Sequence, residues 1–231
     1  MRNKNMKKAL NKTALALLAS LTLSLSANAG IKKIPEEYSD NDQAETAKIF
    51  YTAAVEPKLV SDLVFAIDDL NINYPHLKRI YLYINSDGGD MDGGQIAYWA
   101  VKSSKIPITT VNLSMVGSSA SIIFCGAKER LSLPGGKFLL HASSLTGSEG
   151  LLRPDDIDNL KKESAMYNQV FFDTYKQCTS YSDQEISKLL YSEGTRLLLT
   201  ADEVKDKKLI SGMANGIEQT PISYYIIEDS E

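Results

Sequence analysis

The residues best suited to chemistry lie at a junction near the middle of the chain, where Gly117, Ser118 and Ser119 separate two apolar segments. The preceding run, 106–113, is rich in β-branched residues and is typical of a strand, whereas the run from Ile122 to Cys125 is typical of a buried helix. A serine at a strand-to-helix turn can present its hydroxyl at the strand end, and the unpaired N–H groups of the helix start can face a developing negative charge. Ser118 is therefore a candidate nucleophile. A serine-rich turn can also simply cap a helix or fill a space too small for larger side chains.

A serine nucleophile needs a base that removes its proton, and histidine is the usual choice. The chain has two histidines. His141 ends the strand-like run Lys137–His141, whereas His76 lies in a polar loop and is expected to be solvated. His141 is therefore the candidate base, although a lone histidine at a strand end can also be purely structural.

The elements before the serine turn predict the sheet that positions it. A strand at Ala47–Val55, an amphipathic helix at Lys58–Asn71 and a strand at Arg79–Asn85 follow one another. This order predicts a right-handed βαβ unit and hence a parallel sheet. A turn with the sequence Ser-Asp-Gly-Gly, residues 86–89, follows at once, and a second crossover leads to the strand that ends at the serine turn. Both turns should lie at the same carboxyl edge of the sheet and form a cleft.

The second half of the chain continues in the same α/β pattern, with no repeat and no second domain boundary. Further strands are predicted around 128–132, 137–141 and 197–199, and further helices at Asp155–Tyr175, from Ser182 or Asp183 onward, and at Thr200–Lys207.

The first 29 residues have the three parts of a secretory signal peptide. Basic residues come first, the apolar stretch Ala14–Leu25 follows, and Ala27-Asn28-Ala29 is an A-x-A cleavage site. The apolar stretch is short for an uncleaved membrane anchor, which is the weaker alternative. We expect a periplasmic or secreted protein with a signal peptide at 1–29, a loose N-terminal arm at 30–46 and one domain at 47–231.

Composition narrows the function further. The formal net charge is −4, and removal of the basic leader makes it more negative, so nucleic acid is not an expected partner. With two histidines and no Cys/His cluster, we expect no metal site and no cofactor. The two cysteines could pair in an exported chain, but Cys125 fits better as a small buried hydrophobic residue than as a partner of Cys178.

Several of these segments resemble the proteolytic subunit of the Clp protease, within the ClpP/crotonase superfamily. The stretch YLYINSDGGDMDGGQIAYWAV is similar to the family's strand, glycine loop and helix, with Asp87 where proline is usual. LLHA resembles the strand that leads to the family's catalytic histidine, and LTADEVKDKKLI resembles its closing helix. The resemblance spans roughly Ala47 to Ser211 and implies an α/β fold of stacked ββα units.

Carried over position by position, the resemblance implies the roles of individual residues. Ser118 becomes the nucleophile, because it follows Gly89 by 29 residues without a gap, as in the family. Ser121 mimics the local small-residue motif but would need an insertion. His141 becomes the base, and the backbone N–H groups of Gly89 and Ser119 become the oxyanion hole.

The third member of the catalytic site is where the resemblance fails. Ser192 stands where the family has aspartate, and the neighbouring Glu193 is the nearest carboxylate that could orient His141. If neither does so, the site is a Ser-His dyad or is inactive. Another set of carboxylates, which can equally be the acidic first turn of a helix, comprises Asp155, Asp156 and Asp158.

The resemblance implies an exported serine peptidase that acts on short or unfolded polypeptides and assembles as a ring-shaped homo-oligomer through the long helix. Because ATP is absent outside the cytoplasm, no ATPase partner is expected. The alternative is a weak or inactive protein of the same fold that binds peptides or partners, favoured by the missing aspartate. A crotonase-type acyl-thioester enzyme is a third alternative, although coenzyme A is not expected outside the cytoplasm.

Overall fold

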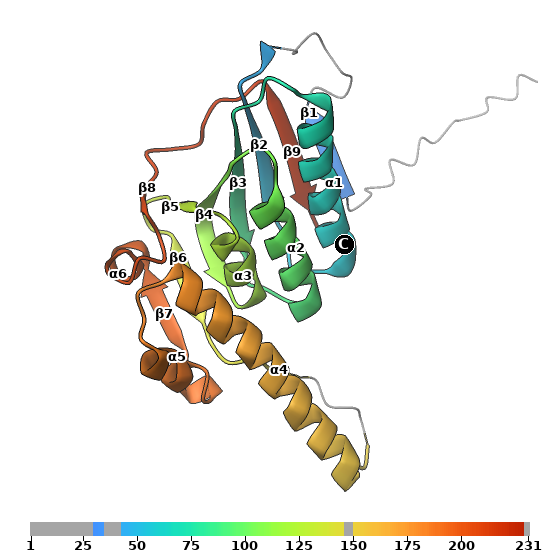
Figure 1. Cartoon of the computed structure of the whole chain (residues 1–231), viewed down its shortest axis with the longest axis vertical. Helices are drawn as coiled ribbons and strands as arrows, with labels where there is room; N and C mark the ends of the chain where they lie inside the picture. The colour runs from blue at the N-terminus through green and yellow to red at the C-terminus, as the bar shows by residue number, and fades with distance from the viewer. Residues whose placement is uncertain (1–29, 35–42, 146–149, 229–231) are drawn as a thin grey trace, which may run out of the picture.

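A twisted sheet with helices packed on one face forms the body of the protein in this computed structural model, which describes residues 30–34, 43–145 and 150–228 (Figure 1). The strands in these residues are β1 (Gly30–Ile34), β2 (Thr46–Thr52), β3 (Arg79–Ser86), β4 (Ile108–Gly117), β5 (Glu129–Ser132), β6 (Lys137–Leu140), β7 (Leu197–Thr200), β8 (Gly212–Met213) and β9 (Ile222–Ile227). Their order is β1-β9-β2-β3-β4-β5-β8, with β6 paired to β4 and β7.

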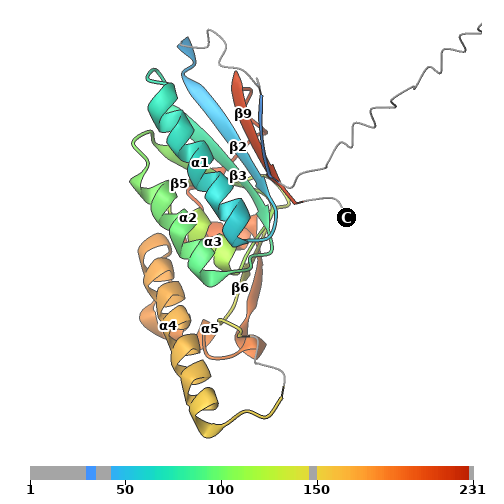
Figure 2. The same cartoon turned by 90° about the vertical axis from the view of Figure 1, so that its right-hand side faces the viewer.

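The centre of the sheet is parallel, as the strand and helix order predicts. β2 pairs with β3, β3 with β4, and β4 with both β5 and β6, all in parallel. The helices are α1 (Pro57–Asn73), α2 (Met91–Ser103), α3 (Ser119–Cys125), α4 (Pro154–Cys178), α5 (Asp183–Leu189), the short 3-10 turn η2 (Glu193–Thr195) and α6 (Ala201–Asp206). Figure 2 shows α1, α2 and α3 on the same face of the sheet.

The alternation of side chains along β2 and β3 explains why one face of the sheet is covered by α1, α2 and α3. In β2, Ala47, Ile49 and Tyr51 point into the core and are at most 1 % exposed. Alternate residues of β3, such as Leu82 and Ile84, are buried beside them. Because side chains alternate across a strand, this set forms one apolar surface that the helices cover.

The expectation of a loose N-terminal arm is wrong for residues 30–34. These residues form β1, which pairs antiparallel with β9, and β9 in turn runs parallel to β2. Lys33 of β1 also forms an ion pair with the buried carboxylate of Asp69 on α1, at 3.2 Å. The short segment has little pattern of its own, so a partner strand near the other end of the chain determines its structure. The proposed signal peptide and residues 35–42 lie outside the described residues.

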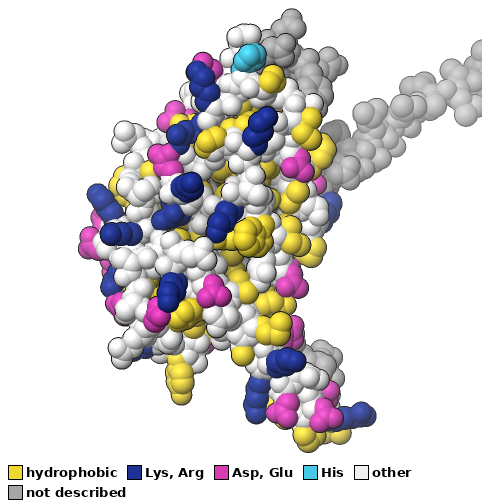
Figure 3. Space-filling view, viewed as in Figure 1, with side chains coloured by type: hydrophobic (Ala, Val, Ile, Leu, Met, Phe, Trp, Pro, Cys, Tyr) yellow, Lys and Arg dark blue, Asp and Glu magenta, His cyan; other side chains and the backbone are white. Residues whose placement is uncertain are grey.

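Helix α4 leaves the body of the protein and projects from it (Figure 1). Its first half is largely exposed, and large apolar side chains there and just before it are open to solvent: Leu151, Leu152, Ile157 and Met166 are 40–99 % exposed. Figure 3 shows hydrophobic side chains at this projecting end. In the described residues no helix is both long and apolar enough to cross a membrane.

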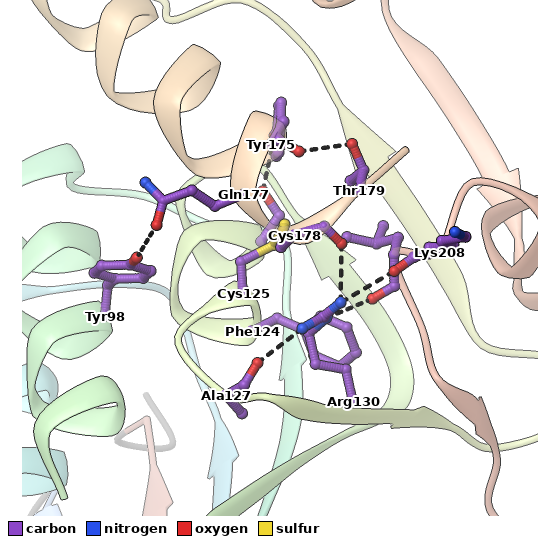
Figure 4. The surroundings of a disulfide bond; sticks show 12 residues. Tyr98, Phe124, Cys125, Ala127, Arg130, Tyr175, Gln177, Cys178, Thr179 and Lys208 are labelled. Carbon is purple, nitrogen blue, oxygen red and sulfur yellow. Dashed lines mark hydrogen bonds between the residues drawn. A yellow bond between two sulfur atoms is a disulfide. The ribbon is translucent and has the colours of Figure 1, made fainter. Parts of the chain in front are cut away.

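The two cysteines are bonded, which corrects the expectation that Cys125 is only a small buried residue. Cys125 ends α3, Cys178 ends α4, and their Cα atoms are 5.7 Å apart (Figure 4). The bond exists because the C-terminal end of α4 packs on α3. Sequence alone hides this contact, since 53 residues separate the two positions.

Candidate active site

The serine turn is built as a strained junction between β4 and α3. Ser118 lies between the last residue of β4 and the first residue of α3, with φ 48° and ψ −129°. A positive φ is uncommon for a residue with a side chain, and it persists only where the surrounding structure holds it. Its amide donates to the carbonyl of Leu139 on β6, at 2.9 Å, which ties the turn to the neighbouring strand.

The glycine turn after β3 packs directly against the serine turn. Gly88 has φ +103°, and a Cβ atom placed on it would lie 2.5 Å from the Cβ of Ser118 and 3.0 Å from the amide nitrogen of Ser119. No other residue can approach the serine so closely, because every other side chain would overlap it. The close approach brings the candidate nucleophile and the glycine turn into one site.

The backbone of Gly89 is oriented by a bridge to the segment after β2. Val55 donates to the carbonyl of Gly88 at 2.8 Å and accepts from the amide of Asp90 at 2.7 Å. In such a parallel bridge the N–H of the middle residue, Gly89, points away from Val55. The amide of Ser119, at the start of α3, is likewise not used within its helix. Two backbone donors are thus available around the serine turn.

His141 follows the end of β6, next to the serine turn. β6 runs parallel to β4 with Gly117 opposite Leu139, so the residues after the two strands emerge at the same edge. The side chain of His141 is 14 % exposed, and its Nδ1 lies 3.3 Å from Oε2 of Glu193. The two atoms are not aligned as a hydrogen bond, so Glu193 acts on His141 through its charge when the ring is protonated. Nε2, on the other side of the ring, remains for a substrate or a serine.

Glu193 is the carboxylate that the structure brings to His141. It begins the turn η2, and its side chain is 59 % exposed. Its other oxygen accepts a hydrogen bond from Arg196 at 2.8 Å. This bond, followed by the charge of His141, lowers the pKa of the Glu193 carboxyl, so the group stays ionised near neutral pH. The sequence-aligned Ser192 instead takes part in capping η2.

The other candidates from the sequence lie elsewhere. Ser121 is buried inside α3, where its hydroxyl donates to the carbonyl of Ser118 at 2.6 Å. His76 is exposed in the loop before β3. Asp155 and Asp156 occupy the first turn of α4, and Asp156 accepts from the amide of Arg153 at 2.8 Å, as a helix-capping residue does.

A small cavity lies beside the glycine turn. It measures about 240 Å³ and is lined by Asn85, Ser86, Asp87, Met115 and Glu228, among others. Asp87 is exposed at this position. Among the described residues, no group of three or more His, Cys, Asp or Glu side chains could hold a metal ion.

Comparison with known proteins identifies the family to which this fold belongs. Residues 37–216 match the protein family described as Clp protease. The chain therefore belongs to the Clp protease family, and its α/β fold is the expected one. Its relatives' names support a peptidase, which is a hydrolase.

Individual relatives are distant, and the share of the chain that they cover differs from one to another. ATP-dependent Clp protease proteolytic subunit 1 of Chlamydia caviae is 25 % identical over 176 residues, which is 75 % of this chain and 90 % of that protein. Proteolytic subunit 2 of Borreliella burgdorferi is 31 % identical over 113 residues, 46 % of this chain and 54 % of that protein. The solved structure of a ClpP1 point mutant from Listeria monocytogenes matches with a TM-score of 0.59 at 20 % identity, over 76 % of this chain and 93 % of that one, and so supports the fold.

Proposed function

We propose that this protein is an exported serine peptidase that hydrolyses peptide bonds of short or unfolded polypeptides. The observation that carries the proposal is the strained turn at Ser118, packed against Gly88 and flanked by the backbone donors of Gly89 and Ser119. This arrangement has the parts that acyl transfer needs: a presented hydroxyl and N–H groups for the oxyanion.

In the proposed reaction, Ser118 Oγ attacks the substrate carbonyl carbon while His141 Nε2 takes the hydroxyl proton. The carbonyl oxygen becomes an oxyanion that the N–H groups of Gly89 and Ser119 stabilise. His141 then returns the proton to the leaving amine as the peptide C–N bond breaks, and water hydrolyses the acyl-enzyme in a second round of the same steps. The ionised Glu193 stabilises the imidazolium, weakly, because it is mostly exposed.

Export is supported by two independent features. The leader at 1–29 has the parts of a signal peptide. The Cys125–Cys178 disulfide is typical of proteins outside the reducing cytoplasm. In that location no ATP is present for an unfoldase, so the enzyme would act alone on substrates that are already short or unfolded.

We also propose that the protein assembles as a homo-oligomeric ring, with α4 between protomers. Membership of the family supports this, and the exposed apolar side chains at the projecting end of α4 give it a surface to bury. Sedimentation of the purified protein would show a species several times the monomer mass, and charged substitutions at Ile157 and Met166 would reduce it.

One observation favours a second candidate, a peptide-binding protein that does not cleave. Ser192 replaces the family's aspartate, and the contact between His141 and Glu193 is not an aligned hydrogen bond. Such a protein would bind unfolded polypeptide with the same cleft and release it intact.

Labelling with a fluorophosphonate separates these candidates, because it requires an activated serine. The purified wild-type protein should be labelled and should cleave casein and short fluorogenic peptides, and Ser118→Ala should lose both activities. Ser121→Ala should still be labelled, although more slowly, since the Ser121 hydroxyl is buried and bonds to the backbone of the turn. Failure of the wild type to label or cleave would favour the binding protein, and labelling lost only in Ser121→Ala would overturn the choice of serine.

A further inference from the structure

The serine helix α3 and the projecting helix α4 are joined by a buried contact close to the candidate nucleophile. The Tyr175 hydroxyl of α4 lies 2.8 Å from Ser121 Oγ of α3, and both side chains are fully buried. Ser121 in turn reaches the carbonyl of Ser118 with its hydroxyl, at 2.6 Å, and with its amide, at 2.9 Å. A chain of hydrogen bonds therefore connects α4 to the backbone of the serine turn.

The direction of this chain follows from the number of protons. A serine hydroxyl has one proton, and Ser121 gives it to the carbonyl of Ser118. The Tyr175 hydroxyl must then be the donor to Ser121 Oγ. Donation by Tyr175 polarises the Ser121 hydroxyl and keeps its O–H directed at the carbonyl oxygen of Ser118.

The carbonyl of Ser118 belongs to the same peptide unit as the amide of Ser119. A trans peptide places its C=O and N–H on opposite sides, so holding the carbonyl inside the protein directs the N–H outward. Because Gly88 lies against the amide nitrogen of Ser119, the outward direction is the side of the glycine turn.

We propose that Tyr175 is a positioning residue that acts through Ser121 to fix the Ser118–Ser119 peptide, and so aims the Ser119 N–H at the reacting carbonyl oxygen. The proposal deepens the proposed peptidase function and rests on it. It gives α4, the helix that projects from the body, a direct effect on the chemistry of the site. The tyrosine does not touch the substrate.

The environment of Tyr175 suits a permanent donor. Burial raises the pKa of its hydroxyl, so the group keeps its proton at neutral and moderately basic pH. Its ring stacks on Phe171 of the same helix, with centroids 5.6 Å apart. The ring therefore has packing of its own, and removal of the hydroxyl alone leaves that packing in place.

The disulfide secures the end of α4 that carries Tyr175. Cys125 lies one helical turn after Ser121, and Cys178 lies one turn after Tyr175, so the covalent bond and the hydrogen bond join the same two helices side by side. Figure 4 shows Tyr175 and the disulfide on this end of α4.

A partly buried arginine adds to this anchor. Arg130 donates to the carbonyl of Cys178 at 2.9 Å and to those of Lys208, at 3.0 Å, and Ala127, at 2.9 Å (Figure 4). Burial of the guanidinium lowers the pKa of Arg130, which remains a cation. The guanidinium of Arg130 thus binds backbone carbonyls from the end of α4 and from two loops.

The decisive variant is Tyr175→Phe, which removes only the hydroxyl. Loss of a whole oxyanion donor costs about 10²–10³ in kcat, so a donor that is merely less well aimed should cost about tenfold in kcat, with KM almost unchanged. The rate of fluorophosphonate labelling and the affinity for a peptide boronic acid, which mimics the tetrahedral intermediate, should fall by a similar factor. An unchanged kcat in the variant would overturn the proposal.

The matched control is Tyr224→Phe. Tyr224 is also fully buried and donates its hydroxyl to Asp69, which keeps Lys33 and Asn73 as partners. This variant should lower the thermal midpoint as Tyr175→Phe does, yet leave kcat unchanged. An equal fall in kcat in both variants would show general destabilisation and overturn the positioning role.

A double variant separates positioning from packing. Ser121→Ala leaves the Tyr175 hydroxyl buried without an acceptor, so adding Tyr175→Phe to it should recover thermal stability but not kcat. Recovery of both stability and kcat would show that the Tyr175–Ser121 pair is only structural.

A second double variant tests the disulfide. Cys125→Ala/Cys178→Ala should lower kcat in the wild type but have no further effect on kcat in Tyr175→Phe. Additive losses of kcat would overturn the role given to the disulfide.

One readout does not depend on activity. Hydrogen exchange of residues 117–125 should be faster in Tyr175→Phe than in the wild type or Tyr224→Phe, whether or not the protein cleaves peptides. A wild-type protein that is not labelled and does not cleave would refute the peptidase function. Unchanged hydrogen exchange in Tyr175→Phe would refute the positioning of the serine turn by Tyr175, whatever the activity.

Discussion

The two halves of the candidate site are built very differently. Around Ser118, a strained backbone is held by the glycine turn, by β6 and by the chain of hydrogen bonds from α4. The Glu193 carboxylate, by contrast, is mostly exposed. It makes one 3.3 Å contact with His141 and accepts a hydrogen bond from Arg196. Several buried contacts hold the half of the site around Ser118, the nucleophile half, in place. The half around Glu193, the acid half, is mostly exposed to solvent.

This difference indicates which half the activity depends on. Interactions among buried dipoles are strong because no solvent competes with them, whereas an exposed ion pair contributes little. A site whose acid is exposed can therefore keep most of its activity when the acid changes, provided that the serine, the base and the backbone donors stay in place. The following predictions test that division, from the largest expected effect to the smallest.

His141→Ala should have the largest effect. In the proposed reaction His141 takes the proton from Ser118 and gives it to the leaving amine, a contribution of about 10²–10⁴ in rate. Steady-state cleavage of a fluorogenic peptide measures the loss. His76→Ala, in the exposed loop, is the control and should behave as wild type. Near-normal turnover in His141→Ala would mean that the base is another group.

Gly89→Ala should be almost as damaging to the nucleophile half. A Cβ at this position would lie 2.4 Å from the carbonyl oxygen of Val55, at a φ of +147° that side chains rarely adopt. The turn must shift and its N–H with it, so kcat should fall about 10²-fold, as on loss of an oxyanion donor. Gly216→Ala, where nothing lies within 4 Å, is the control. Retained kcat in Gly89→Ala would show that this N–H does not serve the reaction.

Glu193→Gln should have a clearly smaller effect. The change removes the negative charge next to His141 but keeps the size of the side chain at position 193. Because this side chain is 59 % exposed, we expect a loss of about tenfold in kcat. Ser192→Ala should change kcat by less than about twofold, since Ser192 only caps η2. A drop in Glu193→Gln as large as that of His141→Ala would contradict the division between the two halves. No drop at all would make the site a dyad.

Glu185→Gln should affect stability only, and only above acidic pH. Hydrogen bonds from Lys207 and Ser182 lower the pKa of Glu185 from 4.5 to about 2. A lowered pKa in the folded state means that the carboxylate stabilises the fold above pH 4.5, and that this contribution is lost as the pH falls towards 2. Thermal melts should therefore separate wild type from Glu185→Gln at about pH 7 and converge near pH 2, with equal activity at neutral pH. A separation that grows in acid would contradict this sign.

Much of the fold and of the nucleophile half was predictable because its pattern is local. The β-branched run that becomes β4, the small residues after it and the apolar start of α3 lie within about twenty residues of one another. The choice of Ser118 over Ser121 came from the family resemblance, through the interval from Gly89. The helix boundaries of α1 and α4 follow from apolar periodicity and lie within a few residues of the predicted ones.

The features that escaped prediction all join segments that are distant in sequence. β1 and β9, which the sequence left without an assigned strand, are ordered by pairing with each other and with β2. Cys125 and Cys178 approach each other only because α4 returns to α3. A local window contains no information about such partners, so the expectation of an unpaired Cys125 was wrong.

The amino-acid sequence by itself determined most of the strands and helices between β2 and α6, the serine at the turn and the glycines that allow its close packing, because these depend on residue type and short spacing. Only the tertiary structure decided that Glu193, and not Ser192, contacts His141, and that Tyr175 reaches the serine turn through Ser121. Those contacts depend on how two helices and a 3-10 turn pack onto the sheet. Packing of that kind is set by the whole core at once and by no single motif.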